Sequence, residues 1–437
     1  MDTGMKKLSL MIALALLPTA AVSDSFKDLD NAVTELNKPA YIERAEFLEW
    51  HSNHLAEFAN WRKEYIKKWD GERKDSIQTW GDTVIDSEHL AVEVSADNTS
   101  RTIIDFEKET VTFEVLVDEG LEPKDITTLV SQHVEQAEQL ESLLGSNLLS
   151  AVTYEELSER DLDYSNEKEK TALREILAQT NQQLQEMEKE VELLAETSGA
   201  EVDPKLVDQQ KQELVDDALT RMQVLNNIYE KQRERVAEDS RSAKIMTYQV
   251  RMPSESLEKR IAPYLADIYK QSEAFDIEPA LVLAIMHTES SFNSRARSPV
   301  PAFGLMQVVT TSAGHDVNRI VHKVDKPMNE NDLYQPDYNI EAGTAYLDIL
   351  NSRYLKHIND PQSREYCVIA AYNTGAGNVA KAFGERRLAN AVEKINTLSP
   401  EDVYHTLINH LPYDETVNYL KKVTDRKAMY REEKGAV

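Results

Sequence analysis

One carboxylic acid in this sequence has the surroundings that a general acid needs. Glu289 follows an apolar run at residues 281–286, and Pro279 precedes that run. Proline suits the first turn of a helix and the run has no polar face, so the sequence predicts a helix buried nearly all round. Apolar neighbours and the negative end of the helix dipole both disfavour a carboxylate at its C-terminal end. We therefore expect a raised pKa at Glu289, as general acid catalysis requires.

Further motifs follow this acid along the chain. Residues 289–292 read ESSF, residues 304–307 read GLMQ, residues 371–373 read AYN, and residues 411–420 read LPYDETVNYL. In this order the four motifs resemble those of the lysozyme-like lytic transglycosylases, which cleave the glycan strands of peptidoglycan. The resemblance is closest to the membrane-bound lytic murein transglycosylase C type, through residues 307–309 and 313–317.

The resemblance implies a mechanism that uses one protein carboxylate. In the family, the 2-acetamido group of N-acetylmuramic acid (MurNAc) attacks its own anomeric carbon, and the MurNAc–GlcNAc β-1,4 bond breaks with formation of a 1,6-anhydro ring. Glu289 is then the sole acid and base. The residues implied to bind the sugar are Ser291, Met306, Gln307, Tyr372, Asn373 and Tyr419. Most glycosidases use two carboxylates, and we find no second acid in a comparable motif.

Some alternatives stay open at this point. A lysozyme-type hydrolase on the same fold and a non-catalytic peptidoglycan-binding scaffold are both compatible with parts of the pattern. Asn373 has an alternative role as a helix C-cap, because glycines follow it. We expect no metal and no cofactor, since His287, His315 and His322 have no coherent ligand spacing with cysteines or acids.

Composition and the first residues bear on where the protein acts. The net charge of −28 over 437 residues argues against binding to nucleic acid and against charge-driven adhesion to anionic lipid. Residues 1–23 resemble a signal peptide, with Lys6 and Lys7, a short apolar core and a small-residue cleavage site. We therefore expect export to the periplasm.

The only cysteine, Cys367, lies in an apolar run and predicts a buried thiol without a disulfide. The predicted signal peptide has no lipobox cysteine, whereas the resembled type is typically lipid-anchored. Association with the outer membrane is therefore left open.

The mature chain is expected to be mainly α, in three parts. Residues 24–150 are predicted to form an N-terminal α+β domain, with strands at 88–94 and 102–117 because apolar and polar residues alternate there. The resemblance implies a lysozyme-like α-helical catalytic domain at 244–437, which begins with a short extended link at 244–253.

The third part, at 155–240, is predicted to be a long helical hairpin or coiled-coil insertion between the two domains. Apolar residues at coiled-coil spacing run from Leu173 to Leu194, the pattern breaks near residues 197–204, and a second helix is expected at 205–236. Two roles remain for the hairpin: a spacer that sets the reach of the catalytic domain, or a docking surface for an envelope protein.

Overall fold

The computed structural model describes residues 40–118, 120–136, 140, 153, 156–198, 204–238 and 243–434. The chain divides into two compact units, residues 1–57 and 58–437, and the description that follows concerns the second. The expected signal peptide at 1–23 lies outside the described residues.

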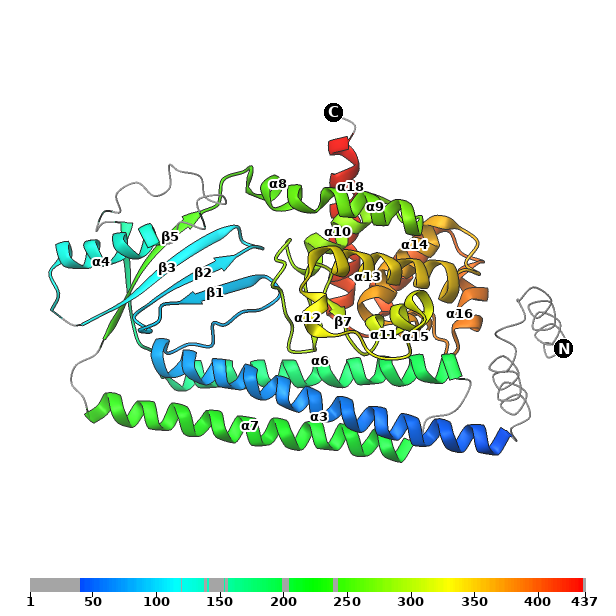
Figure 1. Cartoon of the computed structure of the whole chain (residues 1–437), viewed down its shortest axis with the longest axis horizontal. Coiled ribbons are helices and arrows are strands. Elements are labelled where there is room, and N and C mark those ends of the chain that lie inside the picture. Colours follow the sequence, from blue (N-terminus) through cyan, green and yellow to red (C-terminus); the bar gives the residue numbers. More distant parts are fainter. Residues whose placement is uncertain are drawn as a thin grey trace, which may run out of the picture. The chain divides into compact units, whose positions relative to one another are not determined.

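The N-terminal α+β domain is built on a five-stranded antiparallel sheet (Figure 1). Its strands lie in the order β1-β2-β3-β5-β4, and their bounds are Leu90–Val94 (β1), Ser100–Asp105 (β2), Thr110–Val117 (β3), Ser158–Asp161 (β4) and Lys244–Arg251 (β5). Helix α4, Pro123–Gln136, buries Val130 and Val134 in a core shared with Val111 and Phe113 of β3. The first three strands lie in or close to the segments where strands were predicted, although β2 is buried at five of its six positions and does not alternate.

Strand β5 corrects the expected domain boundary. Residues 244–253 were expected to be an extended link that opens the catalytic domain, but β5 lies between β3 and β4 in the sheet, with Phe113 paired to Tyr248. Its alternation is that of an ordinary strand, and its partner β3 lies more than a hundred residues earlier in the sequence. The N-terminal sheet therefore extends to Arg251, and the catalytic helices begin after it.

The predicted hairpin is present as helices α6, Asn166–Ser198, and α7, Pro204–Glu238. It is inserted between the neighbouring strands β4 and β5, and the part of α3 (Ala40–Trp80) that belongs to this unit, residues 58–80, runs beside both helices (Figure 1). The three helices share a small apolar core that contains Ile77, Ile176 and Tyr229. Arg221 of α7 also binds Asp70 of α3 at 2.7 Å. The hairpin therefore packs against α3.

The remaining residues form a helical domain around α10, Pro279–Glu289 (Figure 1). The other bounds are Ser256–Ile261 (α8), Ala262–Tyr264 (η4), Leu265–Phe275 (α9), Ala302–Phe303 (β6), Val308–Val309 (β7), Ala313–Val317 (α11), Asn318–His322 (η5), Glu330–Leu333 (α12), Pro336–Ile349 (α13), Leu350–Tyr354 (η6), Pro361–Thr374 (α14), Ala376–Ala382 (α15), Leu388–Ile395 (α16), Pro400–His410 (α17) and Asp414–Lys434 (α18). The mainly α fold class is confirmed.

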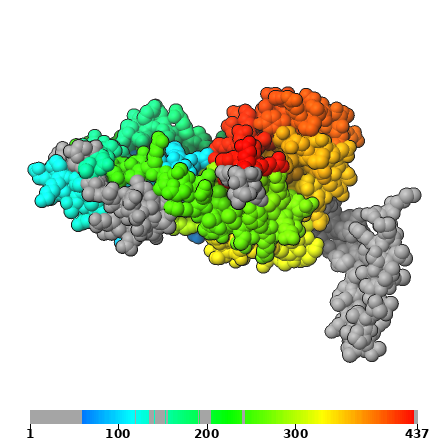
Figure 2. Space-filling model, turned by 90° about the horizontal axis from the view of Figure 1, so that it is seen from above, coloured from blue at the N-terminus to red at the C-terminus, as the bar shows by residue number. Residues whose placement is uncertain are grey.

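Burial explains why α10 occupies the centre of this domain. Every residue from Ala280 to Met286 is buried, because the helix has no polar face to turn toward water. Helix α18 packs along it, and the space-filling view shows α18 (red) beside the orange segment that carries α17 (Figure 2). Cys367 of α14 is a buried thiol, as predicted. Within the described ranges, no helix is both long and apolar enough to cross a membrane.

Candidate active site

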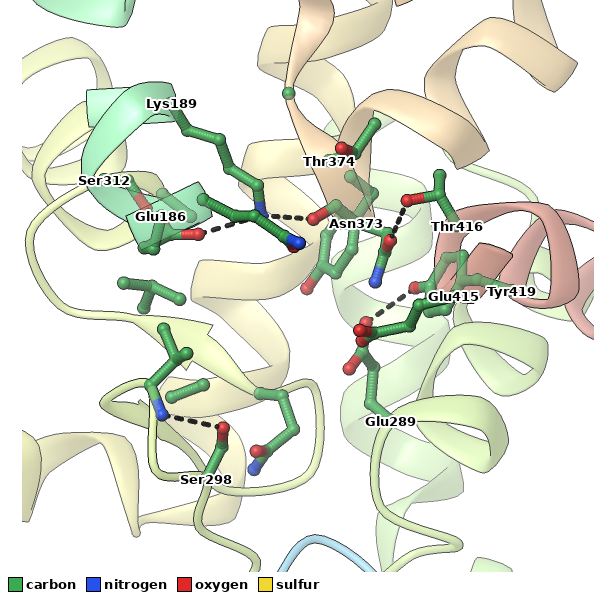
Figure 3. Close-up of a pocket in the computed structure, with 18 of the residues that line it drawn as sticks. Glu186, Lys189, Glu289, Ser298, Ser312, Asn373, Thr374, Glu415, Thr416 and Tyr419 are labelled. Carbon is green, nitrogen blue, oxygen red and sulfur yellow. Dashed lines mark hydrogen bonds and ion pairs between the residues drawn. The ribbon is translucent and has the colours of Figure 1, made fainter. Parts of the chain in front are cut away.

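A cavity of about 450 Å³ surrounds Glu289 at the end of α10. Four of the predicted sugar-binding residues line it together with the acid: Gln307, Tyr372, Asn373 and Tyr419. They come from the turn between β6 and β7, from the end of α14 and from α18, so packing brings together motifs that are far apart in sequence. Figure 3 shows Glu289 and Tyr419 facing each other in this cavity, with Glu415 beside them.

The electrostatics of Glu289 suit a general acid. Burial raises the pKa of its carboxyl to about 8, and the negative charges of Glu415 and Glu88 act in the same direction. A hydrogen bond of 2.6 Å from the Tyr419 hydroxyl to Glu289 Oε1 and the positive charge of Lys189 oppose this rise. Because the effect of burial on the pKa is larger than these two opposing effects, the carboxyl is mostly protonated at neutral pH and can donate a proton to a leaving group.

Tyr372 and Asn373 hold the walls of the cavity together. The Tyr372 hydroxyl donates to the backbone carbonyl of Met306 at 2.9 Å, and burial raises its pKa well above the usual value, so the hydroxyl keeps its proton. The Asn373 side-chain oxygen accepts a hydrogen bond of 2.8 Å from Thr416 of α18. The C-cap of α14 is Gly375, so the alternative role of Asn373 as a cap does not apply.

The GLMQ turn is shaped by packing against α12 and α13. Gly304 has a φ of +73°, and a Cβ there would lie 2.4 Å from the carbonyl oxygen of Leu333 and 2.5 Å from Asn339 Nδ2. Only glycine fits this position, and Gly304 does not itself line the cavity. Met306 is also fully buried away from the cavity, against Gly343. The part of the turn that reaches the cavity is Gln307, whose amide donates to the Gly304 carbonyl at 2.9 Å.

Ser291 lies in a different place from the one that the resemblance implies. Its side chain is fully buried outside the cavity lining, and its hydroxyl donates to Glu107 at 3.1 Å and lies 3.3 Å from His89 Nδ1. Its carbonyl oxygen accepts a hydrogen bond of 2.8 Å from Arg260. These partners attach the end of α10 to the N-terminal domain, so the geometry gives Ser291 a positioning role.

Several residues that line the cavity were not among the site residues predicted from the sequence. Glu88 and His89 come from the segment before β1, and burial raises the pKa of Glu88. Glu415 of α18 also lines the cavity; it lies within the fourth motif, at residues 411–420, but was not among the residues implied to bind the sugar. A further set comes from α6: Gln182, Gln185, Glu186 and Lys189. Apolar spacing predicted α6 but could not show which polar side chains face the acid.

Metal chemistry has no site in the residues that the structure describes. No group of three or more histidine, cysteine, aspartate or glutamate side chains there is placed to hold an ion. Two of the histidines considered above instead pair with single acids, His315 with Asp325 at 2.8 Å and His322 with Glu341 at 3.1 Å.

The geometry defines a helical domain whose candidate active site is organised around one buried acid. Residues 267–395 of this domain match the family model "Transglycosylase SLT domain". The chain therefore carries a transglycosylase SLT domain at these residues. Curated relatives include the membrane-bound lytic murein transglycosylase C of Pectobacterium atrosepticum, 46% identical over 187 residues, and that of Serratia proteamaculans, 45% identical over the same length. Each match covers 43% of this chain and 52% of the relative, so the chain spans about half the length of the curated relatives it matches.

Among solved structures, an inactive mutant of the lytic transglycosylase Slt from Pseudomonas aeruginosa is 27% identical, over 39% of this chain and 24% of that one. Its TM-score is 0.31.

Proposed function

We propose that this protein is a periplasmic peptidoglycan lytic transglycosylase, a lyase that cleaves the MurNAc–GlcNAc β-1,4 bond and forms 1,6-anhydro-MurNAc. The observation that carries the proposal is Glu289, a carboxyl with a pKa of about 8 in a cavity large enough for sugar rings. The transglycosylase SLT match and the relatives named lytic murein transglycosylases support peptidoglycan as the substrate.

The reaction proceeds in two steps with one protein acid. In the first, the substrate's acetamido oxygen attacks its own anomeric carbon, the bond to the leaving oxygen breaks, and that oxygen takes the proton of Glu289. In the second, the muramyl 6-hydroxyl oxygen attacks the same carbon and passes its proton to the Glu289 carboxylate. The bond to the acetamido oxygen then breaks and the acid is restored. No water is consumed, and Glu289 alternates between acid and base.

Tyr419 assists the ionised state of the acid. Its hydroxyl donates to Glu289 Oε1 and therefore stabilises the carboxylate that exists between the two steps. Gln307, Tyr372 and Asn373 orient the sugar from the surrounding walls, since side-chain amides and hydroxyls can both donate to and accept from N-acetyl and hydroxyl groups.

A lysozyme-type hydrolase is the second candidate, and one observation favours it. Glu88 and Glu415 share the cavity with Glu289, so further carboxylates are present that could activate a water molecule. The two reactions differ in product mass, because hydrolysis adds one water to the new end and the lyase reaction adds none.

Digestion of isolated peptidoglycan sacculi tests the proposal. We expect wild-type protein to release anhydro products, identified by mass spectrometry, and Glu289→Gln to release none while keeping its fold by circular dichroism. Glu401→Gln, on an exposed part of α17, is the matched control and should behave as wild type. Hydrated products would establish the hydrolase, and an inert wild-type protein would favour the binding scaffold.

The location in the periplasm rests on the predicted signal peptide. The relatives are named membrane-bound, so attachment to the outer membrane is a further possibility for this chain. Docking of an envelope protein on the hairpin stays a prediction. Fractionation of cells that express the full chain distinguishes soluble periplasmic protein from protein that sediments with membranes.

A further inference from the structure

One face of α6 forms part of the cavity wall. Gln182, Gln185, Glu186 and Lys189 all line the cavity, and their spacing of three and four residues places them on one side of the helix. Helix α6 lies outside residues 267–395, the segment that matches the transglycosylase SLT model. The hairpin therefore adds a polar surface to the site that the matched domain does not itself contain.

Two of these side chains connect α6 to opposite walls of the cavity (Figure 3). Glu186 accepts a hydrogen bond of 2.6 Å from Ser312, which immediately precedes α11. Lys189 lies 2.8 Å from the Glu186 carboxylate and also donates to the backbone carbonyl of Asn373 near the end of α14. The sequence of contacts Ser312–Glu186–Lys189–Asn373, called here the α6 bridge, thus spans from one wall to the other.

The bridge is well protected from solvent. The Glu186 side chain is 8% exposed and that of Lys189 21% exposed. The Lys189 stem lies over Gly375, where an added Cβ would be 3.4 Å from its Cγ atom. Hydrogen bonds between ionised partners are stronger than neutral ones, and each charge of the pair is compensated by the other. The pair is therefore suited to hold α6 in place.

A further contact fixes the same helix to the loop before β6. Gln183 donates to the carbonyl of Pro299 at 3.0 Å, and both groups are buried. Helix α6 is thus attached at three points around the cavity: the loop at 298–301, Ser312 and Asn373.

We propose that α6 closes one end of the cavity and restricts the enzyme to the ends of glycan strands. The inference rests on the proposed function. Cleavage within a polymer requires a groove open at both ends, because the strand must continue past the reacting bond on either side. A helix fastened to both walls obstructs one of these paths, whereas a strand terminus needs only the other. Lys189 and Glu186 are positioning residues in this role.

The length distribution of early products tests the proposal. Long, peptide-free glycan strands are digested to a small extent and separated by chromatography. We expect wild-type protein to release short terminal products from the start, with little change in the length of the remaining strands. Lys189→Met, which keeps an apolar stem but removes the ammonium, and the double variant Glu186→Gln/Lys189→Met should raise the ratio of internal to terminal cuts several-fold.

Two further variants and a measurement of thermal unfolding distinguish the effect of the α6 bridge from a general loss of folding. Ser312→Ala removes one attachment of the bridge and should give a smaller increase in internal cuts. Lys170→Met, on the exposed outer part of α6, is the matched control and should leave the product lengths as in wild type. Thermal unfolding shows whether each variant is folded.

The outcomes separate this inference from the proposed function. Wild-type protein that cuts strands internally from the start would overturn the closed end while leaving the lyase in place, as would folded bridge variants with wild-type product lengths. Wild-type protein that cuts no strand at all, although folded, would instead remove the proposed function.

Discussion

Burial and the charges of neighbouring residues together set the pKa of Glu289, and each charged neighbour can be changed separately by mutation. Burial is the largest cause of the value of about 8, and among the charged neighbours Glu415 raises it while Lys189 lowers it. A donor acid works only while protonated, so activity is expected to be high below about pH 8 and to fall as pH rises through that value. The alkaline limb of the pH profile therefore reports the pKa of Glu289 and so the environment of its carboxyl.

Glu415→Gln should move this limb toward lower pH. Removing a negative charge makes ionisation of Glu289 easier, so its pKa falls and activity is lost earlier as the pH rises. The pH dependence of kcat/KM on a soluble glycan measures the shift, with Glu393→Gln on the exposed side of α16 as control. A shift toward higher pH, or none, would show that the charge of Glu415 does not act on the acid.

At the scale of elements, the end of α10 is attached to the N-terminal domain. Arg260 of α8 donates to the carbonyls of Phe106 at 3.1 Å and Ser291 at 2.8 Å, and it pairs with Glu109 at 2.9 Å. The guanidinium thus joins the turn between β2 and β3 to the residues just after Glu289. The N-terminal domain is in this way part of the support of the catalytic acid.

Arg260→Met should weaken this joint and lower stability. The two buried carbonyls lose their donor, so we expect a cost of about 2 to 4 kcal/mol in the free energy of unfolding. Urea titration measures it, and the exposed neighbour Lys259→Met should cost little. A wild-type midpoint for Arg260→Met would mean that other contacts hold the joint.

Local patterns were enough to predict most elements, since the strands β1 to β3, both hairpin helices and the buried α10 follow from the spacing of apolar residues. The clustering of Gln307, Tyr372, Asn373 and Tyr419 around Glu289 followed from the motifs. The rest depended on contacts between distant segments. Strand β5 has its partner in β3, and the α6 side chains reach the cavity only once the hairpin has folded onto it.

The dependence on contacts between distant segments also explains why Ser291 and Met306 were predicted to bind the sugar. Both belong to motifs that surround the acid, and the family resemblance implied contact with the sugar. The structure uses them for packing, Ser291 against the N-terminal domain and Met306 against α13. Residues adjacent to a catalytic group can serve the backbone geometry that positions it, and no local pattern separates the two roles.

At the scale of the whole molecule, α3 and the catalytic helices share one hydrophobic core. Tyr65, Ile66 and Trp69 of α3 belong to the same cluster of buried residues as α10 and α18. The Tyr65 hydroxyl donates to the Ser298 carbonyl at 2.8 Å, and Arg297 lies over the ring of Trp69. We therefore expect the N-terminal helix and the catalytic helices to unfold together.

Tryptophan fluorescence makes this cooperativity measurable, because every tryptophan of the chain lies between residues 50 and 80, outside the catalytic helices. Ile285→Val, a fully buried site in α10, should cost about 1 kcal/mol. If the unit is cooperative, thermal midpoints from fluorescence and from far-ultraviolet circular dichroism should fall by the same amount, although the mutated residue lies in another element. A lower midpoint by circular dichroism with unchanged fluorescence would show that α3 unfolds independently, and the support of the cavity by the N-terminal helices would then be weaker than their contacts indicate.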